Sequence, residues 1–150
     1  MKITELTWRE PVVIDAAASI DAAAELMARQ GVGALVVVDH DVPVGVVTDR
    51  DIVTRGIASG VPLDGRIDAV MTMGPIGLAP SDDLDDLFAL FAQHAIRRVP
   101  ILQRDRVVGM VSLDDAVVSM ANSMASVAKV LTAQILFPHA GDDAPVPAVT

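Results

Sequence analysis

The fold of this chain is decided by two stretches of sequence, "GVVTDRDI" at residues 45–52 and "GMVSLDDA" at residues 109–116. In each stretch a glycine and an apolar run lead into a threonine or serine, and an aspartate follows three positions later. Valine-rich runs are typical of strands, and Ser/Thr-x-x-acid is typical of the first turn of a helix. The two stretches therefore predict the same strand-to-helix junction twice, 64 residues apart.

The rest of the chain repeats at the same spacing. Residues 2–53 align without a gap to residues 66–117, and apolar residues match apolar residues along most of the alignment. The identical pairs include Pro11/Pro75, Asp21/Asp85, Leu26/Leu90, Gly45/Gly109 and Asp51/Asp115. A repeat of this length indicates two copies of one supersecondary unit.

Each copy has the same order of predicted elements. A short opener and a proline precede a brief strand, then come an amphipathic helix, a hairpin with a polar turn, and a second helix. One such β-α-β-β-α unit exposes a sheet face that a second unit can cover. We therefore predict an α/β (α+β) fold of two repeats related by a pseudo-twofold axis, with a C-terminal helix extension. The expected boundaries are 1–58 for repeat 1, 59–65 for a linker, 66–120 for repeat 2, 121–137 for the helix extension and 138–150 for a flexible tail.

Composition narrows the classes of function. Hydrophobic residues make up 52% of the chain, and the formal net charge of −9 argues against nucleic acid as a partner, because phosphate binding needs clustered Lys and Arg. The chain has no cysteine, which excludes disulfides and thiolate metal sites, and its histidines have no partner at metal-ligand spacing. The first residues lack the apolar run of a signal peptide, and no apolar run approaches the roughly 18 residues of a membrane span. We expect a cytoplasmic protein without a membrane partner.

The junctions at 48–51 and 112–115 have two interpretations. In the first they are capping boxes, in which the hydroxyl and the acid satisfy backbone N–H groups at the helix start. In the second the same helix start offers N–H groups to an anion, while the aspartate accepts hydrogen bonds from a cis-diol. A phosphate and a ribose could then be held side by side, and Gly45 and Gly109 would leave room for a flat ligand. Both interpretations are open at the level of sequence.

Over residues 2–120 the chain resembles a tandem pair of CBS domains, the Bateman module, in a stand-alone protein of bacterial type. The resemblance rests on the two junctions, on the strand starts "GVGALVVVD" and "AIRRVPILQ", and on the openers "ITELT" and "IDAVMT". It implies a regulatory module, not an enzyme, without a catalytic cofactor. It also implies an adenine-containing ligand in the cleft between the repeats: AMP, ADP or ATP, with S-adenosylmethionine possible.

The resemblance also implies site residues, with Asp51 and Asp115 each holding a ribose. The residues assigned to the first site are Thr48, Arg50, Asp51, Arg97, Arg98, Val12 and Val13. Those assigned to a weaker second site are Ser112, Asp115 and Ile76. Neighbouring strand residues point to opposite faces, so an alternative is that Arg97 or Arg98 pairs with the acidic run at 82–86.

The two sites differ in charge. Gly33 and Ala34 stand where the second repeat has its two arginines, and Asp114 matches Arg50. We therefore expect one competent nucleotide site, around Asp51, and a weak or empty site, or one for an uncharged ligand, around Asp115.

The last predicted helix is longer than the repeat requires. Its apolar residues recur at helical spacing, at Val117, Met120, Met124, Val127, Leu131 and Ile135. This stripe predicts a homodimer, and Trp8 is expected to pack against the first unit. We expect a sensor that acts on an unidentified partner protein through a change in conformation or dimer geometry. The alternative is a structural dimerisation module with vestigial ligand sites.

Overall fold

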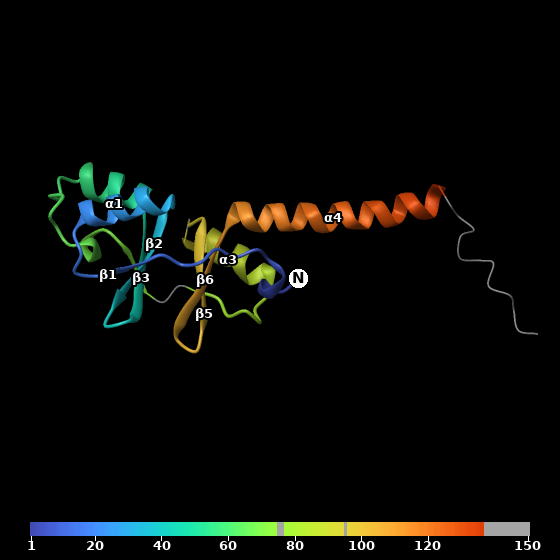
Figure 1. The fold of residues 1–150 in the computed structure, drawn as a ribbon, viewed down its shortest axis with the longest axis horizontal. Helices are drawn as coiled ribbons and strands as arrows, with labels where there is room; N and C mark the ends of the chain where they lie inside the picture. Colours follow the sequence, from blue (N-terminus) through green and yellow to red (C-terminus); the bar gives the residue numbers. More distant parts are fainter. Residues whose placement is uncertain (75–76, 95, 137–150) are drawn as a thin grey trace, which may run out of the picture.

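The computed structural model describes residues 1–74, 77–94 and 96–136. It has a body of two lobes, and one long helix, α4 (Leu113–Leu136), projects from the body (Figure 1). Each lobe is built around the hairpin of one repeat. The predicted α+β fold of two β-α-β-β-α repeats with a C-terminal helix is therefore confirmed.

The first lobe contains a sheet with the strand order β1-β2-β3-β4. β1 and β2 are parallel, and the other neighbours are antiparallel. Valine-rich runs form the central strands because β-branched side chains pack well on a pleated surface. The elements of this lobe are β1 (Val13–Asp15), α1 (Ile20–Gln30), β2 (Ala34–Asp39), β3 (Val42–Thr48), α2 (Asp49–Asp51), its π-helical continuation η2 (Ile52–Ile57), and β4 (Thr72–Met73).

The second lobe repeats this plan. Its hairpin strands are antiparallel, and Leu78 forms a parallel bridge to Ile101 where the first lobe has the β1–β2 pair. The registers shift at Val37/Val38 in the first hairpin and at Ile101/Leu102 in the second, so the duplication extends to the irregularities of the strands. The elements of this lobe are α3 (Leu84–His94), β5 (Arg98–Gln103), β6 (Arg106–Ser112) and the first turns of α4.

Local sequence explains where α1 begins and ends. The Ser19 hydroxyl accepts a hydrogen bond from the Ala22 N–H, which satisfies a free donor of the first turn. The helix ends at Gly31, which has a φ of 64° and so adopts the left-handed conformation that glycine accepts without strain. Ile20 and Met27 are buried on the face that meets the sheet.

The two openers exchange places between the lobes. They form the short helices η1 (Ile3–Glu5) and η3 (Ile67–Ala69). Ile67, from the second repeat, is fully buried in the core of the first lobe, and Ile3, from the first repeat, is fully buried in the core of the second. The core of each lobe is thus completed by the opener of the other repeat. For the same reason the expectation for Trp8 is wrong, since Trp8 packs against the core of the second lobe.

α4 is mostly uncovered in the described chain. Of its residues only Ala116 is buried, and from 116 to 136 its only charged residue is Lys129. The helix is long and apolar enough to cross a membrane, by length and composition only. The helix meets this criterion on its average hydropathy. The sequence expectation concerned continuous apolar runs, and serine, threonine, asparagine and lysine interrupt those in α4.

Candidate functional site

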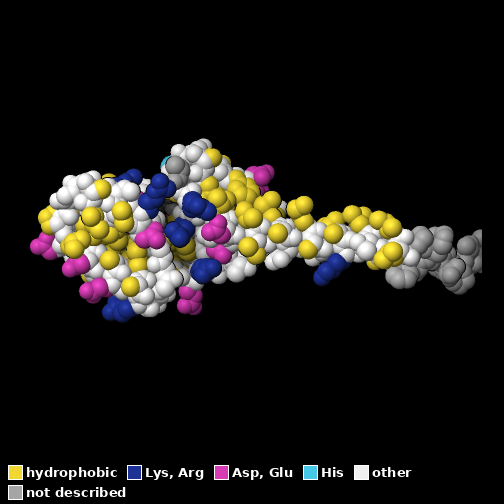
Figure 2. Space-filling model, turned by 90° about the horizontal axis from the view of Figure 1, so that it is seen from above, with side chains coloured by type: hydrophobic (Ala, Val, Ile, Leu, Met, Phe, Trp, Pro, Cys, Tyr) yellow, Lys and Arg dark blue, Asp and Glu magenta, His cyan; other side chains and the backbone are white. Residues whose placement is uncertain are grey.

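A pocket opens between the two lobes, where the junction after β3 faces the start of β5. It encloses about 740 Å³ of empty space, a volume that includes solvent at its mouth. Lys and Arg side chains gather over the junction of the lobes (Figure 2). The lining residues are Val46, Thr48, Asp49, Arg50, Asp51, Thr72, Gly74, Ile96, Arg97, Arg98 and Pro100.

The pocket brings together Thr48, Arg50, Asp51, Arg97 and Arg98, all of which the family resemblance assigned to the first site. Their assignment as nucleotide ligands stays a prediction. Two predicted adenine contacts are placed elsewhere. Val12 packs against the core of the first lobe, and Val13 lines a second, more open hollow. Ile76, predicted for the second site, lies outside the described residues.

The junction at Thr48 is a complete capping box. The Thr48 N–H donates to Asp51 Oδ2 at 3.0 Å, and the Asp51 N–H donates to Thr48 Oγ1 at 3.1 Å. The other carboxylate oxygen, Oδ1, lies 3.9 Å from Arg55 Nε and accepts no hydrogen bond from any described residue. The capping interpretation of the sequence is therefore correct, and it leaves one oxygen of Asp51 available to a ligand.

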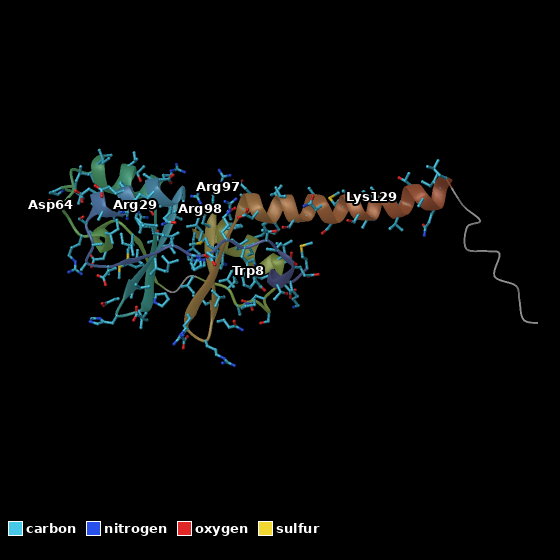
Figure 3. All side chains as sticks on the ribbon, viewed as in Figure 1. Trp8, Arg29, Asp64, Arg97, Arg98 and Lys129 are labelled. Atoms are coloured by element: carbon cyan, nitrogen blue, oxygen red, sulfur yellow. The ribbon has the colours of Figure 1, made fainter. Side chains whose placement is uncertain are left out.

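Arg97 and Arg98 reach the same pocket although they are neighbours in sequence (Figure 3). β5 begins at Arg98, so Arg97 precedes the strand and the alternation of strand side chains does not apply to it. Arg97 Nη2 lies 3.1 Å from Asp114 Oδ1 in the first turn of α4. Neither arginine pairs with a described residue of the acidic run at 82–86, so that alternative is wrong.

Gly33 allows Arg98 to cross from the second lobe to the first. A Cβ atom at Gly33 would lie 3.1 Å from Arg98 Nη2 and 2.9 Å from Asp49 Oδ2. The carbonyl oxygen of Gly33 also accepts a hydrogen bond from the Asp49 N–H at 3.0 Å, which ties the start of β2 to the start of α2. Gly33 is therefore a positioning residue, because a larger side chain here would displace the guanidinium of Arg98 or the carboxylate of Asp49.

Val46 and Asp49 lie within two residues of Thr48, and the other unpredicted lining residues come from two sources. Thr72 and Gly74 belong to the opener that crosses from the second repeat, and Ile96 and Pro100 flank the two arginines. The sequence carried a signal for the second pair, since they lie next to predicted residues. It carried none for the first pair, because the exchange of openers is a property of the tertiary structure.

The second junction has the same backbone geometry and different chemistry. Ser112 and Asp115 form a capping box, in which the Ser112 N–H and Oγ donate to Asp115 Oδ2 at 3.2 and 2.7 Å. Arg9 Nη2 lies 3.5 Å from Asp115 Oδ1. Burial alone would raise the pKa of Asp115, but the hydrogen bonds from Ser112 and the nearby Arg9 guanidinium outweigh it and hold the pKa below its usual value.

Trp8 distinguishes the second junction further. Trp8 is the counterpart of Thr72, and a Cβ atom on Gly109 would lie 2.9 Å from its ring atom Cε3. The indole thus rests on β6, held by a 2.7 Å hydrogen bond from Nε1 to the carbonyl oxygen of Ile3. The first junction faces Thr72 and three arginines across its pocket, whereas Trp8 and Arg9 lie beside the second.

Two regions of the chain, residues 3–57 and 67–122, match the profile of the CBS domain. The chain belongs to the CBS-domain family. Each match covers one of the two sequence repeats, so the tandem CBS pair predicted from sequence is confirmed. Proteins of this family are generally regulatory and not catalytic.

Proteins of other organisms resemble this chain over most of its length. It is 41% identical over 108 residues to the CBS domain-containing protein YhcV of Bacillus subtilis, covering 71% of this chain and 77% of YhcV. It is 40% identical over 95 residues to the uncharacterised protein YlbB of the same organism, covering 62% of this chain and 64% of YlbB. Among solved structures it is similar to the CBS domain protein PAE2072 from Pyrobaculum aerophilum, determined in complex with AMP. That match has a TM-score of 0.69 and 29% identity, and covers 77% of this chain and 89% of PAE2072.

Proposed function

We propose that this chain is a sensor that binds an adenine nucleotide, of the AMP, ADP or ATP class, in the pocket between its CBS domains. The observation that carries the proposal is the meeting of three arginines and Asp51 at one pocket. Guanidinium groups pair with phosphate oxygens through charge-assisted hydrogen bonds, and a carboxylate accepts hydrogen bonds from the hydroxyls of a ribose. The AMP complex of PAE2072 supports adenine as the base.

The capping box orients the ribose-binding group. Because Oδ2 of Asp51 accepts from the Thr48 N–H, the carboxylate is held in one orientation, with Oδ1 free of hydrogen bonds from the described chain. The phosphate is assigned to Arg97, Arg98 and Arg50, of which Arg98 and Arg50 form no ion pair with any described residue. Two of the three guanidiniums therefore meet an anion without first losing an acidic partner.

The site around Asp115 is proposed to take no nucleotide, so that each chain binds one. Its lining lacks the three arginines, because Asp114, Gly33 and Ala34 are their counterparts. Asp115 Oδ1 already accepts a 3.5 Å hydrogen bond from Arg9 Nη2, whereas Asp51 Oδ1 accepts none from the described residues. A phosphate here would meet Asp114 in place of a cation.

The output is proposed to reach a partner protein in the cytoplasm through a change in conformation or dimer geometry. The exposed apolar stripe of α4 supports a homodimer, because large exposed apolar patches mark surfaces that interact with another protein or a membrane. The stripe consists of Val117, Met120, Met124, Val127, Leu131 and Ile135. The competing candidate is a structural dimerisation module, which the complete capping boxes also allow.

A thermal-shift series on the full chain tests the sensor, with AMP, ADP, ATP, S-adenosylmethionine, GTP and adenosine. A ligand at ~100 times its Kd adds about 2.7 kcal/mol of stability, which raises the Tm of a chain this size by roughly 5–10 °C. We expect the rise with adenine nucleotides, its loss in Asp51→Asn, and its retention in the matched variant Asp115→Asn. If no compound shifts the Tm, the dimerisation module is the correct function.

A further inference from the structure

Arg97 belongs both to the pocket and to the helix that projects from the body. It lines the pocket, and its Nη2 lies 3.1 Å from Oδ1 of Asp114, the second residue of α4. Its backbone carbonyl accepts a hydrogen bond from the Leu113 N–H, at the first residue of α4, at 2.9 Å. Figure 3 shows Arg97 beside the start of α4. The first turn of α4 is therefore bound to a pocket residue through backbone and side chain.

The other lobe has only half of this arrangement. At the counterpart of Leu113, the Asp49 N–H donates to the Gly33 carbonyl at 3.0 Å, but Gly33 has no side chain to pair with anything. The counterpart of Asp114 is Arg50, a cation. The side-chain connection thus exists only at α4, the longer and more exposed of the two helices.

Arg97 is also the one arginine of the pocket that has an acidic partner among the described residues. The pair is weak, because the two side chains are 66% and 80% exposed, and exposed pairs contribute about 0–1 kcal/mol. A doubly charged phosphate held by Arg50 and Arg98 could therefore take Arg97 from Asp114. Asp114 would stay compatible with the helix, since an acidic side chain in the first turn suits the helix dipole.

We infer that Asp114 competes with the phosphate of the bound nucleotide for Arg97, and that this competition couples the pocket to α4. The inference rests on the proposed function, and it adds a residue outside the pocket that sets affinity for charged ligands only. The coupling is reciprocal. A partner protein that binds α4 in the state with the Arg97–Asp114 pair formed weakens nucleotide binding. The nucleotide weakens binding of that partner by the same factor.

Hydrogen exchange of the full chain tests the coupling to α4. We expect AMP to speed exchange of the amides at 113–117 in the wild type, because the tie at Arg97 is loosened. Without AMP, Asp114→Asn should show that faster exchange already. Unchanged exchange in both experiments would contradict the coupling.

Isothermal titration of AMP and adenosine tests the competition. We expect Asp114→Asn to tighten AMP binding about twofold to fivefold and to leave adenosine binding unchanged. The matched control Asp64→Asn removes the same charge at the far end of the first lobe (Figure 3) and should change neither affinity.

In an Arg97→Gln background Asp114→Asn should have no effect on AMP binding. Equal tightening in that background would show a direct charge effect and overturn the inference, as would no tightening in a wild-type chain that binds AMP. A wild-type chain that binds no nucleotide overturns the proposed function and the inference together.

Discussion

The N–H group of Ile67 donates to the carbonyl oxygen of Ala18 at 2.7 Å, across the boundary between the two sequence repeats. Its counterpart, from the Ile3 N–H to the Asp82 carbonyl, measures 3.0 Å. The two bonds are related by the 64-residue spacing of the repeat. Each opener is therefore fixed at the start of the α-helix in the opposite repeat, and neither lobe is a continuous piece of chain.

Ile67→Ala should destabilise the first lobe although Ile67 lies in the second repeat. Its side chain is fully buried, and truncation of a buried isoleucine to alanine costs about 2–5 kcal/mol. Chemical denaturation measures the loss. Leu63→Ala, at an exposed position four residues earlier, is the control and should change the free energy of unfolding little. Equal effects of the two variants would contradict the exchange of openers.

Gly45→Ala should be more destabilising than Gly109→Ala. A Cβ on Gly45 would lie 2.5 Å from the backbone oxygen of Thr72, which cannot move without breaking the β3–β4 pairing. A Cβ on Gly109 would meet the Trp8 ring at 2.9 Å, and a side chain can shift. Both Tm values should fall, that of Gly45→Ala further. Trp8 fluorescence should change only in Gly109→Ala, and a reversed order of Tm would contradict this packing.

Arg98→Gln should weaken AMP binding about tenfold to one hundredfold, as expected for loss of a charge-assisted hydrogen bond worth about 1.5–3 kcal/mol. Gly33→Ala should weaken it too, because the added methyl group displaces the Arg98 guanidinium. Titration calorimetry measures both. Lys129→Gln removes a positive charge far along α4 and serves as the control. Retained affinity in Arg98→Gln would remove this residue from the site.

Asp115→Asn should reduce the acid sensitivity of the fold. The folded-state pKa of Asp115 is lowered, so its carboxylate stabilises the fold fully above its unfolded pKa of about 3.9 and loses that contribution as the pH falls through the folded value. Denaturation between pH 6 and about pH 3 should show a shallower loss of stability in Asp115→Asn than in the wild type. Asp64→Asn should follow the wild-type curve, and parallel curves for all three would contradict the lowered pKa.

Leu131→Glu should dissociate the proposed homodimer, because it places a charge within the exposed apolar stripe. Ser126→Glu adds the same charge on the polar face of α4 and should leave assembly unchanged. Light scattering after size exclusion measures the mass. The composition of α4 also allows it to bind a membrane, and flotation with lipid vesicles tests this alternative. A monomeric wild type that floats with vesicles would contradict the homodimer.

The sequence predicted those features that depend on residues close together in the chain. The Thr48–Asp51 and Ser112–Asp115 boxes could be foreseen because both partners of each box lie within four residues and their spacing fixes the geometry. The repeat order was foreseeable because apolar periodicity survives duplication. The gathering of Arg97 and Arg98 at the Asp51 pocket followed from the family resemblance, and the pocket lining agrees with it.

What could not be foreseen depends on contacts between distant parts of the chain. Thr72 lines the pocket only because its opener crosses to the other lobe. Val12 and Val13 were predicted from their nearness to the first strand, but they face the first core and a separate hollow. The Arg97–Asp114 pair was not foreseen because its two residues lie 17 positions apart and meet only through the folding of the β5–β6 hairpin.

The exchange of openers also bears on how such a chain could arise. A single repeat carries an opener that fits the start of the helix in another repeat, so one unit alone leaves its own core uncovered. Two separate copies could complete each other's cores by exchanging openers, as in a domain-swapped dimer. Duplication and fusion would then join, through the residues at 59–65, two partners that already fitted together. Within one chain, that linker keeps each opener close to the core it completes, so the exchange requires no association between separate molecules.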